Sequence, residues 1–378
     1  MISFGIDELI IQNPAWKSKR IGLVTNDAAT TNTGILSRTA LVQAGFTIVC
    51  LFTPEHGISA NAPDGEAQQN SMDTITGLPI ISLYGNKCMP TAQDLENIDL
   101  LLFDIPDIGA RFYTYLWTLT YVLEACAINK KKCIVLDRPN PVSGNFDAAE
   151  GAFLEESSSS FIGRWNIPIK HSCTLGELAL YFNNTKNIDA SLTVVTVKNW
   201  DRDDLATDWG INFVATSPAI QNPNSMLLYP GLCLLEATNI SEGRGSQYSF
   251  ETAAAPWLQT NEIIGFINQS FGDEIKASSI SITPISGKYA QTLCKGIHFE
   301  VIDPAYCKPV FFGLLLLYII RAKHPGQFLW APYKTAVNPS GENHLDKLLG
   351  INNAQKLFDL PLPQFVATCT KITHTPNW

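Results

Sequence analysis

The chain has 378 residues, of which 46% are hydrophobic and 16% are charged, a composition typical of a globular protein with a sizeable core. It carries 26 Lys and Arg against 35 Asp and Glu, which gives a net charge of −9, and its longest basic run is Lys130–Lys132. This balance excludes a polyanion such as nucleic acid as an expected partner.

Cysteine usage and the chain start bear on the cellular compartment. The nine cysteines, an odd number, lie mostly inside apolar runs and form no CxxC pair, as is typical of reduced core residues. The first residues lack the basic and apolar regions of a signal peptide. We therefore expect a cytoplasmic protein, or a periplasmic or exported one if the N-terminus has been trimmed. The longest apolar run, Val310 to Ile320, is too short to span a membrane and predicts a buried helix.

Short apolar strands alternate with helices in the first part of the chain. Helices are predicted at 33–44 and 110–129. Strands are predicted at 21–25, 46–52, 79–84, 99–104 and 132–136. This alternation predicts an α/β fold with a Rossmann-like, doubly wound parallel sheet. A long polar loop at 58–76 interrupts the pattern, and loops of this length are usually functional.

The pattern becomes less regular further along the chain. Thr174 and Glu177 form a capping box ahead of a helix, and another strand is predicted at 192–197. Turn-rich segments place a domain boundary near residue 226. We therefore predict a Rossmann-like catalytic domain over 1–226 and a smaller α+β domain over 227–378 that closes a cleft. Its expected elements are strands near 280–285 and 297–302 and helices at 309–322 and 343–358.

Polar side chains follow four of the predicted strands. They are Thr25-Asn26, Glu55-His56, Asp104 with Asp107, and Asp137-Arg138 with Asn140. Because ligands of open α/β sheets bind at the carboxyl ends of the strands, we expect the four clusters to share one rim. An isolated cluster such as Glu55-His56 is better explained as ordinary loop polarity, but four that converge favour a site.

Glu55 and His56 follow the second strand directly, where Pro54 ends strand pairing. Glycoside hydrolysis needs a carboxylic acid that protonates the leaving oxygen and a second group that stabilises or attacks the anomeric carbon. Glu55 suits the acid role if burial raises its pKa. His56 would orient this acid or bind sugar hydroxyls. The candidates for the second carboxylate are Asp64, Glu66, Asp104 and Asp107.

Each of these carboxylates also has a plausible structural role. Asp107 precedes a predicted helix and would serve as its N-cap, and Arg111 would pair with Asp107 or with an anion of the substrate. In the loop 240–246, glycines flank Arg244, so we expect an accessible guanidinium suited to a carboxylate. A plain surface turn is the alternative. Arg111 and Arg138 are the alternative residues for binding a substrate carboxylate. Each has an acidic neighbour, Asp107 for Arg111 and Asp137 for Arg138.

Other chemistries find no support in the sequence. It contains no GxGxxG after the first strand, no GxxxxGK[ST], no HExxH, no GxSxG and no Cys or His set at metal spacing. We therefore predict that the protein needs no metal, no nucleotide and no other cofactor.

A series of motifs in fixed order runs from about Ile21 to the end of the chain. They are Val24-Thr25-Asn26, Pro54 to Gly57, Asp64-Gly65-Glu66, Thr76 to Pro79, Ser82 to Gly85, Asp104 with Asp107 and Gly109 to Tyr115, Leu136 to Pro141, Glu150-Gly151, Tyr229 to Gly231, and Ser241 with Gly243 to Gly245. Together they resemble the exo-β-N-acetylmuramidase (NamZ) family, long filed as the domain of unknown function DUF1343. The resemblance implies a Rossmann-like domain, a smaller C-terminal domain and a site in the cleft between them.

The resemblance also implies a glycosidase that releases N-acetylmuramic acid from the non-reducing ends of peptidoglycan-derived saccharides or muropeptides, with the family's catalytic glutamate at Glu55. We assign catalysis to Glu55, His56, Asp104 and Asp107. We assign substrate binding to Asn26, Glu66, Arg111, Tyr113, Arg138, Asn140, Glu242 and Arg244. A non-catalytic muropeptide-binding protein on the same scaffold is the alternative. Glu55 favours the enzyme, because binding alone needs no buried acid.

Overall fold

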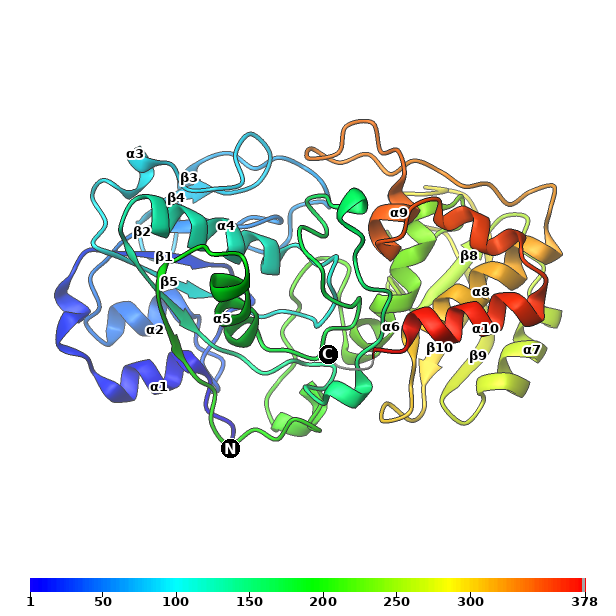
Figure 1. Ribbon diagram of the computed structural model, residues 1–378, viewed down its shortest axis with the longest axis horizontal. Coiled ribbons are helices and arrows are strands. Elements are labelled where there is room, and N and C mark those ends of the chain that lie inside the picture. Colours follow the sequence, from blue (N-terminus) through cyan, green and yellow to red (C-terminus); the bar gives the residue numbers. More distant parts are fainter. Residues whose placement is uncertain (376–377) are drawn as a thin grey trace.

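The structure, a computed structural model, describes residues 1–375 and 378. Figure 1 shows two lobes side by side. The N-terminal lobe is built on a sheet of seven strands, and the C-terminal lobe on a separate sheet of three. The expected α/β architecture with a second, smaller domain is therefore confirmed.

The large sheet has the strand order β3-β4-β2-β1-β5-β6-β7. Its strands are β1 (Ile21–Thr25), β2 (Ile48–Thr53), β3 (Ser71–Met72), β4 (Pro79–Ser82), β5 (Leu100–Asp104), β6 (Lys132–Leu136) and β7 (Ser191–Val195). All neighbouring strands run parallel except β3 and β4. The chain extends the sheet from β1 towards β4 and then resumes on the other side of β1 with β5. This reversal creates the crevice at which doubly wound sheets bind ligands.

Helices cover both faces of this sheet, because successive strand side chains point to opposite sides. Leu23, Leu51 and Leu102 lie in one apolar cluster with α1 (Gly5–Gln12) and α2 (Ser37–Gln43). The adjacent strand residues belong to a second cluster, with α4 (Tyr115–Ile128) and α5 (Leu175–Thr185) on the opposite face. The short helix α3 (Ala92–Leu95) precedes β5.

The C-terminal lobe packs helices around an antiparallel sheet of order β8-β10-β9. Its elements are α6 (Pro223–Leu232), β8 (Thr252–Ala255), α7 (Asn261–Phe271), β9 (Ile275–Ile282), β10 (Cys294–Val301), α8 (Pro309–Lys323), α9 (His344–Leu349) and α10 (Leu362–Thr373). Helices α6 and α8 cross at Gly231 and Gly313. A Cβ on Gly231 would lie 1.8 Å from the carbonyl oxygen of Pro309, so only glycine permits this approach.

Six short 3-10 helices complete the secondary structure of the residues that the structure describes. They span Ala15–Ser18, Phe146–Ala148, Glu156–Ser158, Ala206–Trp209, Cys233–Ala237 and Ala354–Asp359. Among the described residues, no helix is long and apolar enough to cross a membrane. The apolar run expected to form a buried helix is α8, which packs against α6 and α10.

Several predicted boundaries differ from the structure for identifiable reasons. The expected helix at 110–129 begins only at Tyr115, because Ala110 pairs with Lys170 in an extended bridge. The turn signal near residue 222 is a helix start, since the Asn222 side chain accepts a hydrogen bond from the Ser225 amide and caps α6. Helices α1, α7 and α10 and strand β8 had not been predicted.

A buried ion pair ties the ends of β5 and β6 together. Asp104 and Arg138 form two contacts, Nε to Oδ1 at 2.7 Å and Nη2 to Oδ2 at 3.1 Å. Their side chains are 0% and 8% exposed. Arg138 also donates to the Thr30 carbonyl at 2.8 Å, which fixes the loop that follows β1. The pair therefore holds three loops at the rim of the sheet in place.

We expect Asp104→Asn to lower the free energy of unfolding by about 3–5 kcal/mol, because a buried arginine loses its counterion. Urea denaturation would measure the loss. The matched control is Asp99→Asn, which removes an equivalent pair with Arg20 at the surface, with side chains 35% and 49% exposed; there we expect a much smaller loss. Equal losses in both variants would show that the carbonyl contacts of Arg138, and not Asp104, hold the rim.

Candidate active site

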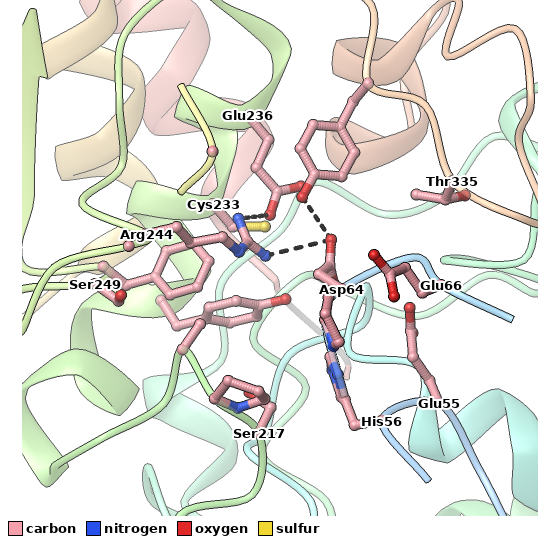
Figure 2. A pocket seen from close by; sticks show the side chains of 18 of the residues that line it. Glu55, His56, Asp64, Glu66, Ser217, Cys233, Glu236, Arg244, Ser249 and Thr335 are labelled. Carbon is pink, nitrogen blue, oxygen red and sulfur yellow. Dashed lines mark hydrogen bonds and ion pairs between the residues drawn. The ribbon is translucent and has the colours of Figure 1, made fainter. Parts of the chain in front are cut away.

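A cavity of about 1080 Å³ lies between the two lobes. The N-terminal lobe contributes the loop after β2 and the start of α4 to its wall, and the C-terminal lobe contributes the loop around Arg244 and the segment around Tyr333. Figure 2 shows side chains from both lobes pointing into the same space. The cavity therefore combines groups that are far apart in the sequence.

Glu55 is a buried carboxyl group in the wall of this cavity, 5% exposed. Its Oε1 accepts a hydrogen bond from the Gly65 amide at 3.0 Å, and its Oε2 accepts one from the Thr114 hydroxyl at 2.8 Å. Burial raises the pKa of Glu55 above its usual range, and the nearby charge of Asp64 raises it further. His56 and Thr114 lower this pKa, but burial outweighs both. The group thus has the environment of a carboxylic acid that keeps its proton.

His56 directly follows Glu55 in a strained turn. Its φ of 69° is in the left-handed region, and Gly57 continues the turn with a φ of 68°. The ring Nδ1 lies 2.8 Å from the carbonyl oxygen of Ala62, which fixes the ring orientation. The turn therefore places the imidazole at the cavity beside the carboxyl group of Glu55.

Glu55, His56 and Asp64 are the described residues that come closest to a metal-binding set. One donor atom from each lies within 4.8 Å of the other two. However, both oxygens of Glu55 already accept hydrogen bonds, and the guanidinium of Arg244 lies beside Asp64. A neighbouring cation opposes a second one, so this arrangement suits proton transfer better than metal binding.

The long loop at 58–76 bridges the lobes, in keeping with the functional role expected from its length. The Tyr333 hydroxyl donates to Asp64 Oδ2, and the Ala336 amide donates to the Gly65 carbonyl at 2.8 Å. Gly65 has a φ of 72°, and a Cβ there would lie 2.9 Å from the side chain of Thr335. Only glycine allows the loop to sit this close to the C-terminal lobe while its amide contacts Glu55.

Arg244 is held by carboxylates, so the expectation of an accessible guanidinium was wrong. Its Nη1 contacts Glu236 Oε1 at 2.6 Å and Glu242 Oε1 at 3.2 Å, and its side chain is 17% exposed. Its Nη2 faces Asp64 Oδ2 at 3.7 Å, too far for a hydrogen bond. The guanidinium also lies over the ring of Phe250, with 4.6 Å to the centroid.

The carboxylates around Arg244 have further partners. Lys288 Nζ contacts Glu242 Oε2 at 3.1 Å, and His344 Nε2 contacts Glu236 Oε2 at 2.9 Å. Burial opposes ionisation of both carboxylates, but the charge of Arg244 and the contact with His344 hold the pKa of Glu236 down to about 2. The charges of Lys288 and Arg244 likewise lower the pKa of Glu242. Both therefore remain ionised and fix the Nη1 end of the guanidinium. Glu242, expected to bind substrate, contacts Arg244 but is not part of the cavity lining.

Several residues expected at the site instead hold loops beneath it. Asp107 accepts from the Gly109 amide at 3.0 Å and contacts His171 Nε2 at 3.1 Å. It caps no helix, since α4 starts eight residues later. Asn26 Nδ2 donates to the Tyr115 hydroxyl, and Asn140 Nδ2 donates to the Cys173 carbonyl. Neither the asparagines nor Asp104, Asp107 and Arg138 line the cavity.

Arg111 and Arg138, the other two arginines considered for binding a substrate anion, both have protein partners, but these differ from the partners expected. Arg111 is 0% exposed and donates to the carbonyl groups of Ala152, Ile167 and Leu348, so the expected pair with Asp107 is wrong. Arg138 pairs with Asp104 and not with Asp137. Asp137 instead accepts from Thr174 and from the Gly176 amide at the start of α5.

The structure brings together Glu55, His56, Glu66, Tyr113 and Arg244 from the predicted set, all of them in the cavity wall. It adds residues that had not been assigned a role in the site. These are Tyr84, Thr114, Glu236, Tyr333 and His344. Tyr84 and Thr114 lie inside motifs already noted, whereas the other three reach the cavity only through the packing of the lobes.

Comparisons with known proteins agree with the resemblance seen in the sequence. Residues 21–224 match the N-terminal part of the family described as exo-β-N-acetylmuramidase NamZ, and residues 227–363 match its C-terminal part. The peptidoglycan β-N-acetylmuramidase NamZ of Bacillus subtilis (strain 168) is 37% identical over 377 residues, which cover 98% of this chain and 90% of that protein.

Two crystal structures of DUF1343 family proteins from Bacteroides fragilis are also similar. One is 28% identical with a TM-score of 0.84, covering 98% of this chain and 97% of its own. The other is 25% identical with a TM-score of 0.71, covering 98% and 95%. With the family matched over most of its length and a relative this similar, the chain belongs to the exo-β-N-acetylmuramidase NamZ family and is a glycosidase, as its sequence predicted.

Proposed function

We propose that this enzyme releases N-acetylmuramic acid from the non-reducing ends of peptidoglycan fragments, with Glu55 as the general acid. The observation that carries the proposal is the buried carboxyl group of Glu55, whose raised pKa keeps a proton available at the cavity wall. The muramidase activity named for the Bacillus subtilis relative supports the choice of substrate.

The surroundings of Glu55 suit an acid that must donate and then recover a proton. Gly65 and Thr114 fix the two oxygens, so the carboxyl group has one orientation. The same two donors stabilise the carboxylate that forms after the proton has left. A positioned acid of this kind contributes about 10²- to 10⁴-fold to the rate.

Arg244 is our proposed contact for the lactyl carboxylate that distinguishes N-acetylmuramic acid from N-acetylglucosamine. Among the described residues lining the cavity, it is the one arginine or lysine. Glu236 and Glu242 hold its Nη1, which leaves Nη2 as the end directed at Asp64 and the cavity. Because Nη2 and Asp64 are 3.7 Å apart, the guanidinium retains hydrogen-bonding capacity for a substrate carboxylate.

We expect Glu55→Gln to lower turnover of an unactivated muramyl disaccharide by about 10²- to 10⁴-fold, because an amide keeps the shape but supplies no proton. A chromogenic β-N-acetylmuramide with a good leaving group should recover part of the activity. Release of sugar and chromophore would be followed for both substrates. The control is Glu300→Gln, an exposed position on β10, and turnover of the disaccharide by Glu55→Gln at the control's rate would refute the acid assignment.

The pH profile provides an independent test of the same role. The acid works only when protonated, so kcat/KM should fall as pH rises through the raised pKa of Glu55, above the usual carboxyl value of 4.5. The Thr114 hydroxyl lowers this pKa by stabilising the carboxylate. Thr114→Val should therefore move the alkaline limb to higher pH, and Thr114→Ser should restore it. A shift to lower pH in the valine variant would contradict this assignment.

We expect Arg244→Ala to lower kcat/KM for muramides at least about tenfold while sparing any activity on the matching glucosaminide. A hydrogen bond between charged groups contributes roughly 1.5–3 kcal/mol, or about ten- to a hundredfold in rate. Arg244→Lys retains the charge for Glu236 and Glu242, so it guards against misfolding of the alanine variant. Equal losses on both sugars would show that Arg244 only holds its loop.

A further inference from the structure

The distance between two carboxyl groups in the cavity bears on how the glycosidic bond is broken. One oxygen of Glu55 and one of Asp64 lie within 4.8 Å of each other. Inverting glycosidases keep their two carboxyl groups about 6.5–9.5 Å apart to admit a water molecule, whereas retaining enzymes bring them to about 5–5.5 Å. The limit of 4.8 Å between these two oxygens is closer to the retaining geometry than to the inverting one.

We propose that Asp64 is the nucleophile of a retaining double displacement, in which Glu55 acts first as acid and then as base. This inference rests on the proposed function, because it concerns the same sugar and the same acid. Figure 2 shows Asp64 between Arg244 and Glu55, with its carboxyl group in the shared space.

Asp64 is held by a hydrogen-bond donor and lies near a cation. The Tyr333 hydroxyl donates to Oδ2, and Nη2 of Arg244 lies 3.7 Å from the same atom. A hydrogen-bond donor and a cation both stabilise a carboxylate. Within residues 1–375 and 378, Oδ1 has no hydrogen-bond partner, and the side chain is 29% exposed. One oxygen is thus held in place while the other is available to attack.

Glu55 has the opposite environment. No cation pairs with it among the described residues, and burial together with the charge of Asp64 favours its protonated form. Two neighbouring carboxyl groups with such different surroundings are typical of an acid and a nucleophile. In the proposed reaction, the proton that passes to the leaving group therefore comes from Glu55.

The other candidate carboxylates are less suitable as the nucleophile. Asp104 is paired with Arg138, and Asp107 contacts His171, both outside the cavity lining. Glu66 lines the cavity but is exposed, and no described residue donates a hydrogen bond to its carboxylate. A nucleophile must be held near the anomeric carbon to react efficiently. Of the four, only Asp64 is both at the cavity and fixed.

The two steps balance in atoms and charge. In the first, Asp64 Oδ1 bonds to the anomeric carbon, the bond to the leaving oxygen breaks, and the Glu55 proton passes to that oxygen. In the second, the ionised Glu55 takes a proton from water, the water oxygen bonds to the anomeric carbon, and the bond to Asp64 breaks. Glu55 ends protonated and Asp64 ionised, as they began.

The stereochemistry of the first product tests the inference on the unmodified enzyme. Proton NMR would follow hydrolysis of a chromogenic β-N-acetylmuramide by enough enzyme to outpace mutarotation. We expect the β anomer of N-acetylmuramic acid to appear first. Initial formation of the α anomer would overturn the double displacement while leaving the proposed function intact. Failure to release any sugar would instead count against the proposed function itself.

Variants distinguish a nucleophile from a carboxylate that only orients the substrate. We expect Asp64→Asn to lower kcat at least about a hundredfold, whereas Asp273→Asn, an exposed position outside the cavity lining, should leave it unchanged. With azide added, Asp64→Ala should form the α-glycosyl azide, because azide attacks from the side vacated by the carboxylate. A β-glycosyl azide from this variant would overturn the inference. So would a loss of activity in Glu66→Gln with none in Asp64→Asn.

Discussion

The hydrogen bond from the Gly65 amide to Glu55 is the contact on which the site depends, because it joins the proposed acid to a loop that the other lobe holds. The Gly65 carbonyl accepts from Ala336, and the neighbouring Asp64 accepts from Tyr333. One short segment therefore contacts the N-terminal lobe through its amide and the C-terminal lobe through its carbonyl and side chain. The cavity wall is complete only when the lobes are packed together, because residues of both lobes line it.

Under the proposed function, the cavity accepts an anionic sugar although the chain has a net charge of −9. Long-range attraction is therefore absent, and recognition has to be local. Asp64, Glu236 and Glu242 surround Arg244. Lys288 neutralises part of this acidic charge, and His344 contacts Glu236. Such a cluster contributes little free positive charge, but it fixes the guanidinium geometrically. Selectivity for the lactyl group would then come from the direction of the hydrogen bonds that Arg244 donates more than from the strength of its electrostatic attraction.

The sequence predicted the sheet well and the site only in part. Strands β1, β2, β5 and β6 were placed to within about two residues, since short apolar runs between turns are a strong local signal. The polar residues at their ends were correctly grouped at one rim, but most of them tie loops together. Sequence alone cannot separate a side chain that faces a ligand from one, such as Asp104, that satisfies a buried neighbour. Tyr333 and Glu236 were missed because only tertiary packing brings them to the cavity.

The residues that line the cavity depend on the residues that hold the loops together at the rim of the sheet. The loops that follow parallel strands have few backbone partners of their own, so buried side chains must fix them. Arg111, Arg138, Asp107 and Asn140 do this below the cavity through contacts with carbonyl, amide and carboxylate groups. Above them, Glu55 has two donors that define its orientation. A catalytic acid needs both a fixed position and a low-dielectric environment. The buried polar residues below the cavity fix the position, and they leave open the cavity that provides the low-dielectric environment.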